Sequence, residues 1–109
     1  MKFEVSTTST FRREAKKMLK KYPSLRQELL ELNDKLSSNP TLGVKLGNNC
    51  FKIRMSIASK GKGKSGGARI ITHFYIEGST VYLLSIFDKS ETDSISDSQI
   101  ADLIKLIRE

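Results

Sequence analysis

The spacing of hydrophobic positions changes twice along the chain, and each change marks a different predicted element. Phe3 and Val5 alternate with Lys2 and Glu4, ahead of a run of hydroxyl residues, and predict a short first strand. From about Thr10, apolar residues recur three and four positions apart, which is typical of one helix face. This helix is expected to end at Tyr22, because a residue before proline avoids the helical region. Ser24 then caps a second helix that stops before Pro40. The apolar stripes of the two helices are Phe11, Ala15, Met18 and Tyr22, and Leu25, Leu29, Leu32 and Leu36.

The second half of the chain has the period of two that is typical of strands. Residues 51–58, 68–77 and 80–89 predict three strands, and a Gly-Ser connection between the last two favours an antiparallel hairpin. Ser96 and Gln99 form a capping box before a closing helix. The predicted fold class is therefore α+β, in the order β-α-α-β-β-β-α. A helical hairpin and a C-terminal helix pack on a mainly antiparallel four-stranded sheet, within one domain that spans residues 1–109.

The positive charge is concentrated in the middle of the chain. The sequence has 19 Lys and Arg against 12 Asp and Glu, a net charge of +7. Residues 1–34 contain eight cations and five acids, and residues 77–109 contain three cations and seven acids. Residues 35–76, by contrast, contain eight cations and not one acid. An acid-free segment of this kind favours contact with a polyanion such as nucleic acid.

Composition narrows the possible functions further. One cysteine, Cys50, and one histidine, His73, are too few for an ordinary zinc site or an intramolecular disulfide, so we expect no metal and no cofactor. The chain has no apolar run of about 18 residues and no secretory leader, so we expect no membrane contact and a cytoplasmic protein.

The segment KGKGKSGGAR, residues 60–69, has three interpretations. ASKGKGKS, residues 58–65, matches a loose P-loop pattern, but a P-loop opens a helix and the residues after this segment have a strand pattern. We therefore expect no nucleotide cofactor. A solvated hairpin loop is the second interpretation, because runs of lysine are often only wet surface. The third is nucleic-acid binding, with lysines on phosphates and glycines allowing close approach of the backbone.

The segments FKIRMSIASKGKGKSGGARIITHFY and VYLLSIFDKSE, together with the order of elements, resemble the RelE/ParE superfamily of bacterial toxins. The resemblance is greatest to the HigB-like RelE branch and extends over essentially the whole chain. It implies a toxin of a type II toxin-antitoxin pair and an endoribonuclease, or mRNA interferase, that cuts mRNA on the ribosome and inhibits translation. It also implies a cognate antitoxin, expected to be of the helix-turn-helix type, with the ribosome and mRNA as the other partners.

The resemblance assigns roles to the basic residues. Members of the family lack a catalytic histidine pair and rely on clustered Lys and Arg. Here the implied catalytic residues are Lys52, Arg54, Arg69 and Lys89. Arginine suits stabilisation of the phosphate's growing charge, and a lysine surrounded by cations suits a general base. The implied RNA-binding residues are Lys45, Lys60, Lys62 and Lys64, with His73 and Glu91 as possible accessory residues.

Two positions depart from the family pattern. Ser90 stands where many RelE members have an arginine, and Ser96 stands where they have a tyrosine. The general acid therefore remains open among Lys89, Asp88 and Glu91. Two other functions stay open as well: a ParE-like poison of DNA gyrase, and a non-catalytic RNA-binding module.

Overall fold

The computed structural model describes residues 2–61, 66–92 and 94–107. Its strands are β1 (Glu4–Thr7), β2 (Val44–Gly47), β3 (Cys50–Met55), β4 (Ala68–Tyr75) and β5 (Thr80–Asp88). Its helices are α1 (Ser9–Lys21), α2 (Leu25–Ser38) and α4 (Asp97–Ile107), and a short 3-10 turn lies at Ala58–Lys60. In this part of the chain no helix has the length and apolar character needed to cross a membrane.

The strands form one sheet in the order β1-β5-β4-β3-β2. Only β1 and β5 are parallel, and the other neighbouring pairs are antiparallel. The predicted α+β class and mainly antiparallel sheet are confirmed, but the prediction of four strands was wrong. The missed strand is β2, an edge strand of four residues whose side chains are mostly exposed. Its sequence, VKLG, alternates between apolar and polar residues over three positions only, which is too short a pattern to indicate a strand.

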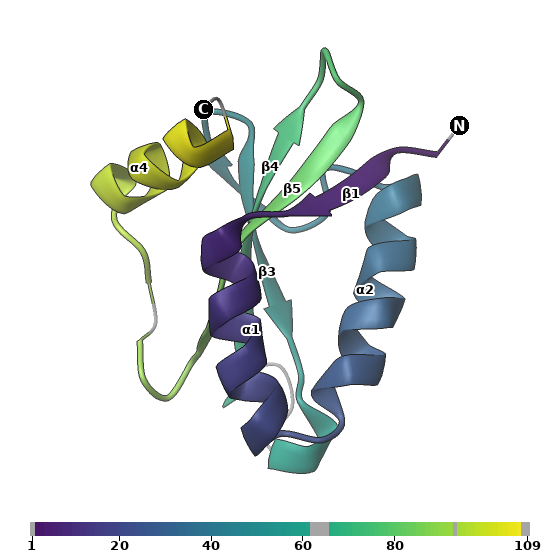
Figure 1. The fold of residues 1–109 in the computed structure, drawn as a ribbon, viewed down its shortest axis with the longest axis vertical. Helices are drawn as coiled ribbons and strands as arrows, with labels where there is room; N and C mark the ends of the chain where they lie inside the picture. The colour runs from purple at the N-terminus through teal and green to yellow at the C-terminus, as the bar shows by residue number, and fades with distance from the viewer. Residues whose placement is uncertain (1, 62–65, 93, 108–109) are drawn as a thin grey trace.

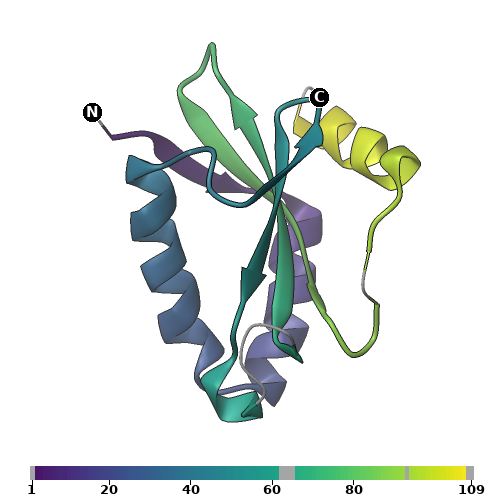
Figure 2. The same ribbon diagram turned by 180° about the vertical axis from the view of Figure 1, so that it is seen from behind.

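The helices cover the two faces of the sheet unequally. Phe11 and Met18 of α1 and Leu32 and Leu36 of α2 belong to the larger core cluster, which includes Ile53, Ile70 and Ile86 of the sheet. A smaller cluster on the other face joins Ile100 of α4 to Cys50, Ile71 and Leu84. Figure 1 shows α4 and α2 on opposite sides of the strands, and Figure 2 shows β2 and β3 from the side opposite α1.

The predicted helix starts had different outcomes. The capping box of α4 is confirmed: the Gln99 amide donates to Ser96 Oγ at 3.1 Å, and the Ser96 amide donates to Gln99 Oε1 at 2.9 Å. Ser24 stands at the N-cap position of α2, as predicted, but its side chain makes no cap hydrogen bond. Its hydroxyl instead accepts from the Ser59 amide at 2.9 Å. Ser24 thus fastens the turn between the helices to the 3-10 turn (Figure 1).

Candidate nucleic-acid interface

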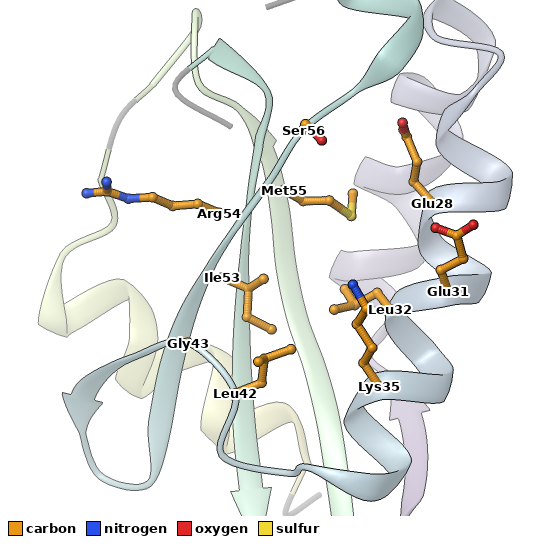
Figure 3. A pocket seen from close by; sticks show the side chains of 10 residues that line it. All are labelled: Glu28, Glu31, Leu32, Lys35, Leu42, Gly43, Ile53, Arg54, Met55 and Ser56. Carbon is orange, nitrogen blue, oxygen red and sulfur yellow. The ribbon is translucent and has the colours of Figure 1, made fainter. Parts of the chain in front are cut away.

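Strand register brings three of the predicted catalytic residues to one face of the sheet. Arg54 of β3 lies opposite Arg69 of β4, and Lys52 lies opposite Ile71, a member of the cluster under α4. Directly opposed residues of antiparallel strands project to the same face. Figure 3 shows Ile53 and Met55 pointing toward α2 while Arg54 points the other way. Lys52, Arg54 and Arg69 therefore share the face opposite α1 and α2, which we call the basic sheet face.

The three cations of the basic sheet face differ in their access to solvent. Arg54 is exposed, Lys52 is half-buried, and Arg69 is 3% exposed. The Arg69 guanidinium donates a hydrogen bond to its neighbour's carbonyl, Ala68 O, at 3.2 Å. Since arginine stays protonated in proteins, the buried Arg69 is a fixed positive charge next to the accessible Arg54 on the neighbouring strand.

No acid of the central strands offsets these charges. The sequences of β3 and β4, CFKIRM and ARIITHFY, contain neither Asp nor Glu. The acid at the end of β5, Asp88, lies on the opposite face, where its carboxylate accepts from the Tyr22 hydroxyl at 2.5 Å. The strands that carry the basic sheet face therefore supply cations and no carboxylates of their own.

Asp88 is the centre of a buried polar cluster that the sequence did not reveal. Its carboxylate forms an ion pair with the Lys60 ammonium, and the two side chains are 2% and 11% exposed. The Ser90 hydroxyl and amide also donate to it, at 2.8 and 3.0 Å. Burial by itself raises the pKa of Asp88, but the donors Lys60, Tyr22 and Ser90 outweigh burial and hold the pKa well below its usual range. Asp88 is therefore an ionised structural anchor.

This cluster changes the interpretation of Lys60. From the sequence we expected Lys60 to bind RNA, whereas in the structure its ammonium lies against Asp88 and 5.7 Å from the centre of the Tyr22 ring. The cluster ties the start of the glycine-rich segment to α1 and to the end of β5. The sequence could not reveal this cluster, because Tyr22 and Asp88 are too far apart along the chain to be linked by any local pattern.

Lys89 follows β5 immediately. Its amide donates to Gly67 O at 3.0 Å, which continues the β4–β5 pairing by one step, and its side chain is half-buried. Alternation from Asp88 directs Lys89 toward the same side as Phe87. Phe87 lies opposite Arg69 and packs against the cluster under α4, so an aromatic ring adjoins the basic sheet face. Phe87 was not among the site residues predicted from the sequence, although its alternation with Asp88 places it on this face.

Other predicted residues lie elsewhere. Lys45 is exposed on β2 opposite Phe51, one position out of phase with Lys52, so it belongs to the other face of the sheet. Glu91 is exposed just after β5. Lys62 and Lys64, together with the end of the P-loop-like pattern, lie outside the described residues.

His73 also lies away from the three cations of the basic sheet face. It is four residues along β4 from Arg69, about 13 Å at strand spacing. It is 7% exposed, and its Nδ1 lies 3.5 Å from Cys50 Sγ. Burial raises the pKa of the Cys50 thiol to about 11, which keeps the thiol neutral at physiological pH. This pair belongs to the part of the sheet that α4 covers.

The two departures from the family pattern have structural explanations. Ser90 bonds to Asp88, and Ser96 caps α4, so each serine has a local partner.

Among the described residues, no three or more His, Cys, Asp or Glu side chains are grouped so as to hold a metal ion.

A groove of about 350 Å³ lies between α2 and β3, on the opposite side of the sheet from Lys52 and Arg69. Its lining includes Leu32, Ile53 and Met55, with Glu28 and Glu31 along α2 (Figure 3). Glu28 accepts hydrogen bonds from the Ala58 amide at 2.7 Å and from Ser24 Oγ at 3.2 Å. At least one acid of this groove thus serves to hold the 3-10 turn.

Comparisons with known proteins point to one fold. No protein-family model matches the sequence. A double arginine-to-alanine mutant of the E. coli toxin RelE in the free state is similar in structure, with a TM-score of 0.62 and 15% identity, over 98% of this chain and 99% of that one. The isolated E. coli RelE toxin gives a TM-score of 0.56 at 17% identity, over 96% and 98% of the two chains. A chain of the RelBE2 toxin-antitoxin complex from Mycobacterium tuberculosis gives 0.57 at 19% identity, over 81% and 92%. Over nearly its whole length, this chain therefore has the fold of the RelE toxins.

Proposed function

We propose that the protein is the toxin of a type II toxin-antitoxin pair and cleaves mRNA on the ribosome. One observation carries the proposal: Arg54 and Arg69 lie directly opposite each other on two strands that contain no acid. Lys52 shares their face, and Lys89 follows the adjoining strand. A surface of this composition suits a phosphodiester whose negative charge grows during reaction. The shared fold with RelE toxins supports the same activity.

The proposed reaction is an internal transfer at phosphorus. The 2′-oxygen loses its proton and attacks the adjacent phosphate, the bond from phosphorus to the 5′-oxygen breaks, and the 5′-oxygen takes up a proton. The products are a 2′,3′-cyclic phosphate and a 5′-hydroxyl. The scheme uses no metal ion, because cationic side chains stabilise the charge.

The side chains divide the work by chemistry and exposure. Lys52 is the proposed acceptor of the 2′-proton, since an arginine does not deprotonate in proteins. Arg54 is exposed and binds the scissile phosphate through its guanidinium fork. Arg69 supplies positive charge beside it, from the neighbouring strand. Phe87 offers a ring beside Arg69 on which a base can stack.

Lys89 is the proposed general acid. Asp88 is excluded from this role because it is ionised, buried and held by Lys60, Tyr22 and Ser90 on the opposite face. Glu91 is exposed beyond the strand end and suits an orienting role. Lys60 is left out of the proposed RNA contacts because its ammonium binds Asp88.

The proposed partners follow from the same assignment. A cognate antitoxin would silence the toxin, and one of the compared structures is a toxin-antitoxin complex. The cationic surface suits an acidic segment of such an antitoxin. The proposal also includes that the toxin is HigB-like, is located in the cytoplasm and depends on the ribosome for cleavage.

The test is controlled expression in bacteria with mapping of mRNA 5′ ends. Wild-type protein should stop translation and leave new 5′ ends within codons. Arg54→Ala should reduce cleavage by about 100-fold or more, the range for losing one preorganised donor to a transition state. Lys45→Ala is the matched control, since it removes one exposed cation from the neighbouring strand but from the other face.

Four outcomes would contradict the proposal. Intact mRNA in arrested cells would do so, and DNA damage signalling with intact mRNA would indicate a ParE-like gyrase poison. Ribosome binding without any cleavage would indicate a non-catalytic RNA-binding module. Equal losses in Arg54→Ala and Lys45→Ala would remove the basic sheet face as the active site.

A further inference from the structure

The solvent face of α1 is almost entirely cationic. Every exposed position from 12 to 21 except Leu19 is a lysine or arginine. These residues are Arg12, Arg13, Lys16, Lys17, Lys20 and Lys21. Phe11, Ala15 and Met18 form the opposite, buried side of the helix. We call the six cations the α1 basic face. The proposed cleavage site does not include it, because α1 packs on the other side of the sheet from Lys52 and Arg69.

The single acid of α1 does not offset this charge. Glu14 turns toward the sheet, where its Oε1 accepts from the Ser85 hydroxyl at 2.8 Å and from the Ile86 amide at 3.3 Å. Among the described residues, the only side-chain ion pairs are Lys60 with Asp88 and Lys105 with Asp102. The α1 basic face therefore points its ammonium and guanidinium groups to solvent without carboxylate partners on its own helix.

The arrangement works against the stability of the helix. The cations repeat at intervals of four residues in the rows 12, 16, 20 and 13, 17, 21, and like charges at this spacing repel each other. The first turn has no acid to interact with the helix dipole. The neighbouring α2 has mixed charges instead, with Glu28 in its first turn, Lys35 in its last, and Glu31 four residues before Lys35. A charge pattern that destabilises one helix but not its neighbour is better explained by binding than by solubility.

The geometry of the α1 basic face identifies its partner. Successive members of each row are separated by about 6 Å along the axis, so the rows are regular and rigid. The exposed side has no aromatic side chain for stacking on bases, which single-strand binding surfaces use. A surface that offers only ammonium and guanidinium groups binds phosphates and does not recognise the base sequence.

We propose that the α1 basic face is a second RNA-binding surface, which holds the phosphate backbone of double-helical RNA while the sheet face acts on a separate strand. The proposal deepens the proposed function and rests on it, because a toxin that works on the ribosome must dock on folded RNA. An acidic protein segment is the competing occupant, and the experiment separates the two.

The experiment compares two variants of equal charge. Arg13, Lys16, Lys17 and Lys20 are changed to Gln in the α1 variant, and Lys2, Arg26, Lys35 and Lys105 are changed to Gln in the control. All eight are exposed, and each variant lowers the net charge from +7 by four. Arg12 is kept because it bonds to Thr7, and Lys21 because it lies over the Tyr22 ring.

Binding to a 20-base-pair RNA hairpin is measured by fluorescence anisotropy between 50 and 200 mM KCl. In a plot of log K against log salt, the α1 variant should lose about 3 to 4 units of slope, one for each lost phosphate contact. The control should lose less than about 1 unit. A DNA hairpin should show the same difference, because phosphate contacts carry no base information.

The melting temperature provides the folding control. Removing like-charge pairs should leave the α1 variant at least as stable as the wild type, so lost affinity cannot be due to unfolding. Equal slopes for the two variants would overturn the proposal. So would unchanged RNA binding together with lost binding to a polyglutamate peptide. Since the hairpin assay requires no cleavage, intact mRNA in cells would refute the nuclease while leaving this result unaffected.

Discussion

At the scale of single residues, the chain separates cations that hold the fold from cations that face solvent. Lys60 and Arg54 are both basic residues of the acid-free middle segment. Lys60 is buried against Asp88, whereas Arg54 is exposed on the basic sheet face. The difference does not lie in side-chain chemistry but in where Asp88 and Tyr22 are brought by the fold.

The Asp88 cluster predicts a large stability effect. Lys60→Met should lower the free energy of unfolding by about 3 kcal/mol, because it leaves a buried carboxylate without its cation. Lys45→Met, at an exposed position, should change it by less than about 0.5 kcal/mol. Urea unfolding measures both, and a loss below about 1 kcal/mol in Lys60→Met would show that the ion pair contributes little.

The same cluster predicts a dependence on pH. Because the pKa of Asp88 is lowered in the folded state, its stabilisation is fully present above the unfolded value of about 4 and is lost as pH falls below it. The free energy of unfolding of the wild type should therefore fall more steeply between pH 5 and pH 2 than that of Asp88→Asn. Parallel curves would mean that Asp88 does not titrate abnormally.

At the scale of elements, caps and charges act within one or two turns and are readable from sequence. The Ser96–Gln99 capping box was predicted and is present, whereas Ser24 stands at its predicted N-cap position without a side-chain cap hydrogen bond. Both serines precede helices, but the Ser24 hydroxyl is recruited by Ser59, which is 35 residues away. Local rules fail where a distant partner competes for the same atom.

The α4 cap predicts a modest effect. Ser96→Ala should destabilise the protein by about 1 kcal/mol, the usual cost of losing a side-chain cap. Ser98→Ala is the matched control, because Ser98 is exposed inside the first turn of the same helix. Thermal unfolding distinguishes them. If both variants melt alike, the capping box adds nothing to the docking of α4.

At the scale of the whole molecule, β3 and β4 carry different residues at their two ends. Arg54 and Arg69 lie at the end that adjoins the glycine-rich segment, while Cys50 and His73 lie at the other end of the same two strands. Ile71, a member of the cluster under α4, lies between Arg69 and His73 along β4. His73 is therefore remote from the proposed reaction even though it is on the same face.

This separation predicts that histidine is dispensable for chemistry. His73→Gln should retain cleavage within about threefold, and the pH–rate profile of the wild type should keep its shape in the variant. The measurement is cleavage of ribosome-bound mRNA from pH 5.5 to 9, with melting temperature as the folding control. A lost inflection near pH 6.5, the ordinary histidine value, would place His73 in the mechanism.

The sequence by itself determined the helices, four of the five strands, the α+β class and the acid-free basic segment, because these depend on residue spacing and charge along the chain. Edge strand β2 was not predictable, since its sequence VKLG alternates over only three residues, too few to indicate a strand. Only the tertiary structure decided which cations meet. The strand register placed Arg54 opposite Arg69, and the β2–β3 pairing placed Lys45 on the other face of the sheet. Lys60 binds Asp88, which is 28 residues away in the sequence. The interaction of two charges depends on their distance in space. That distance cannot be read from their separation in the sequence, because it is set only when the strands pair.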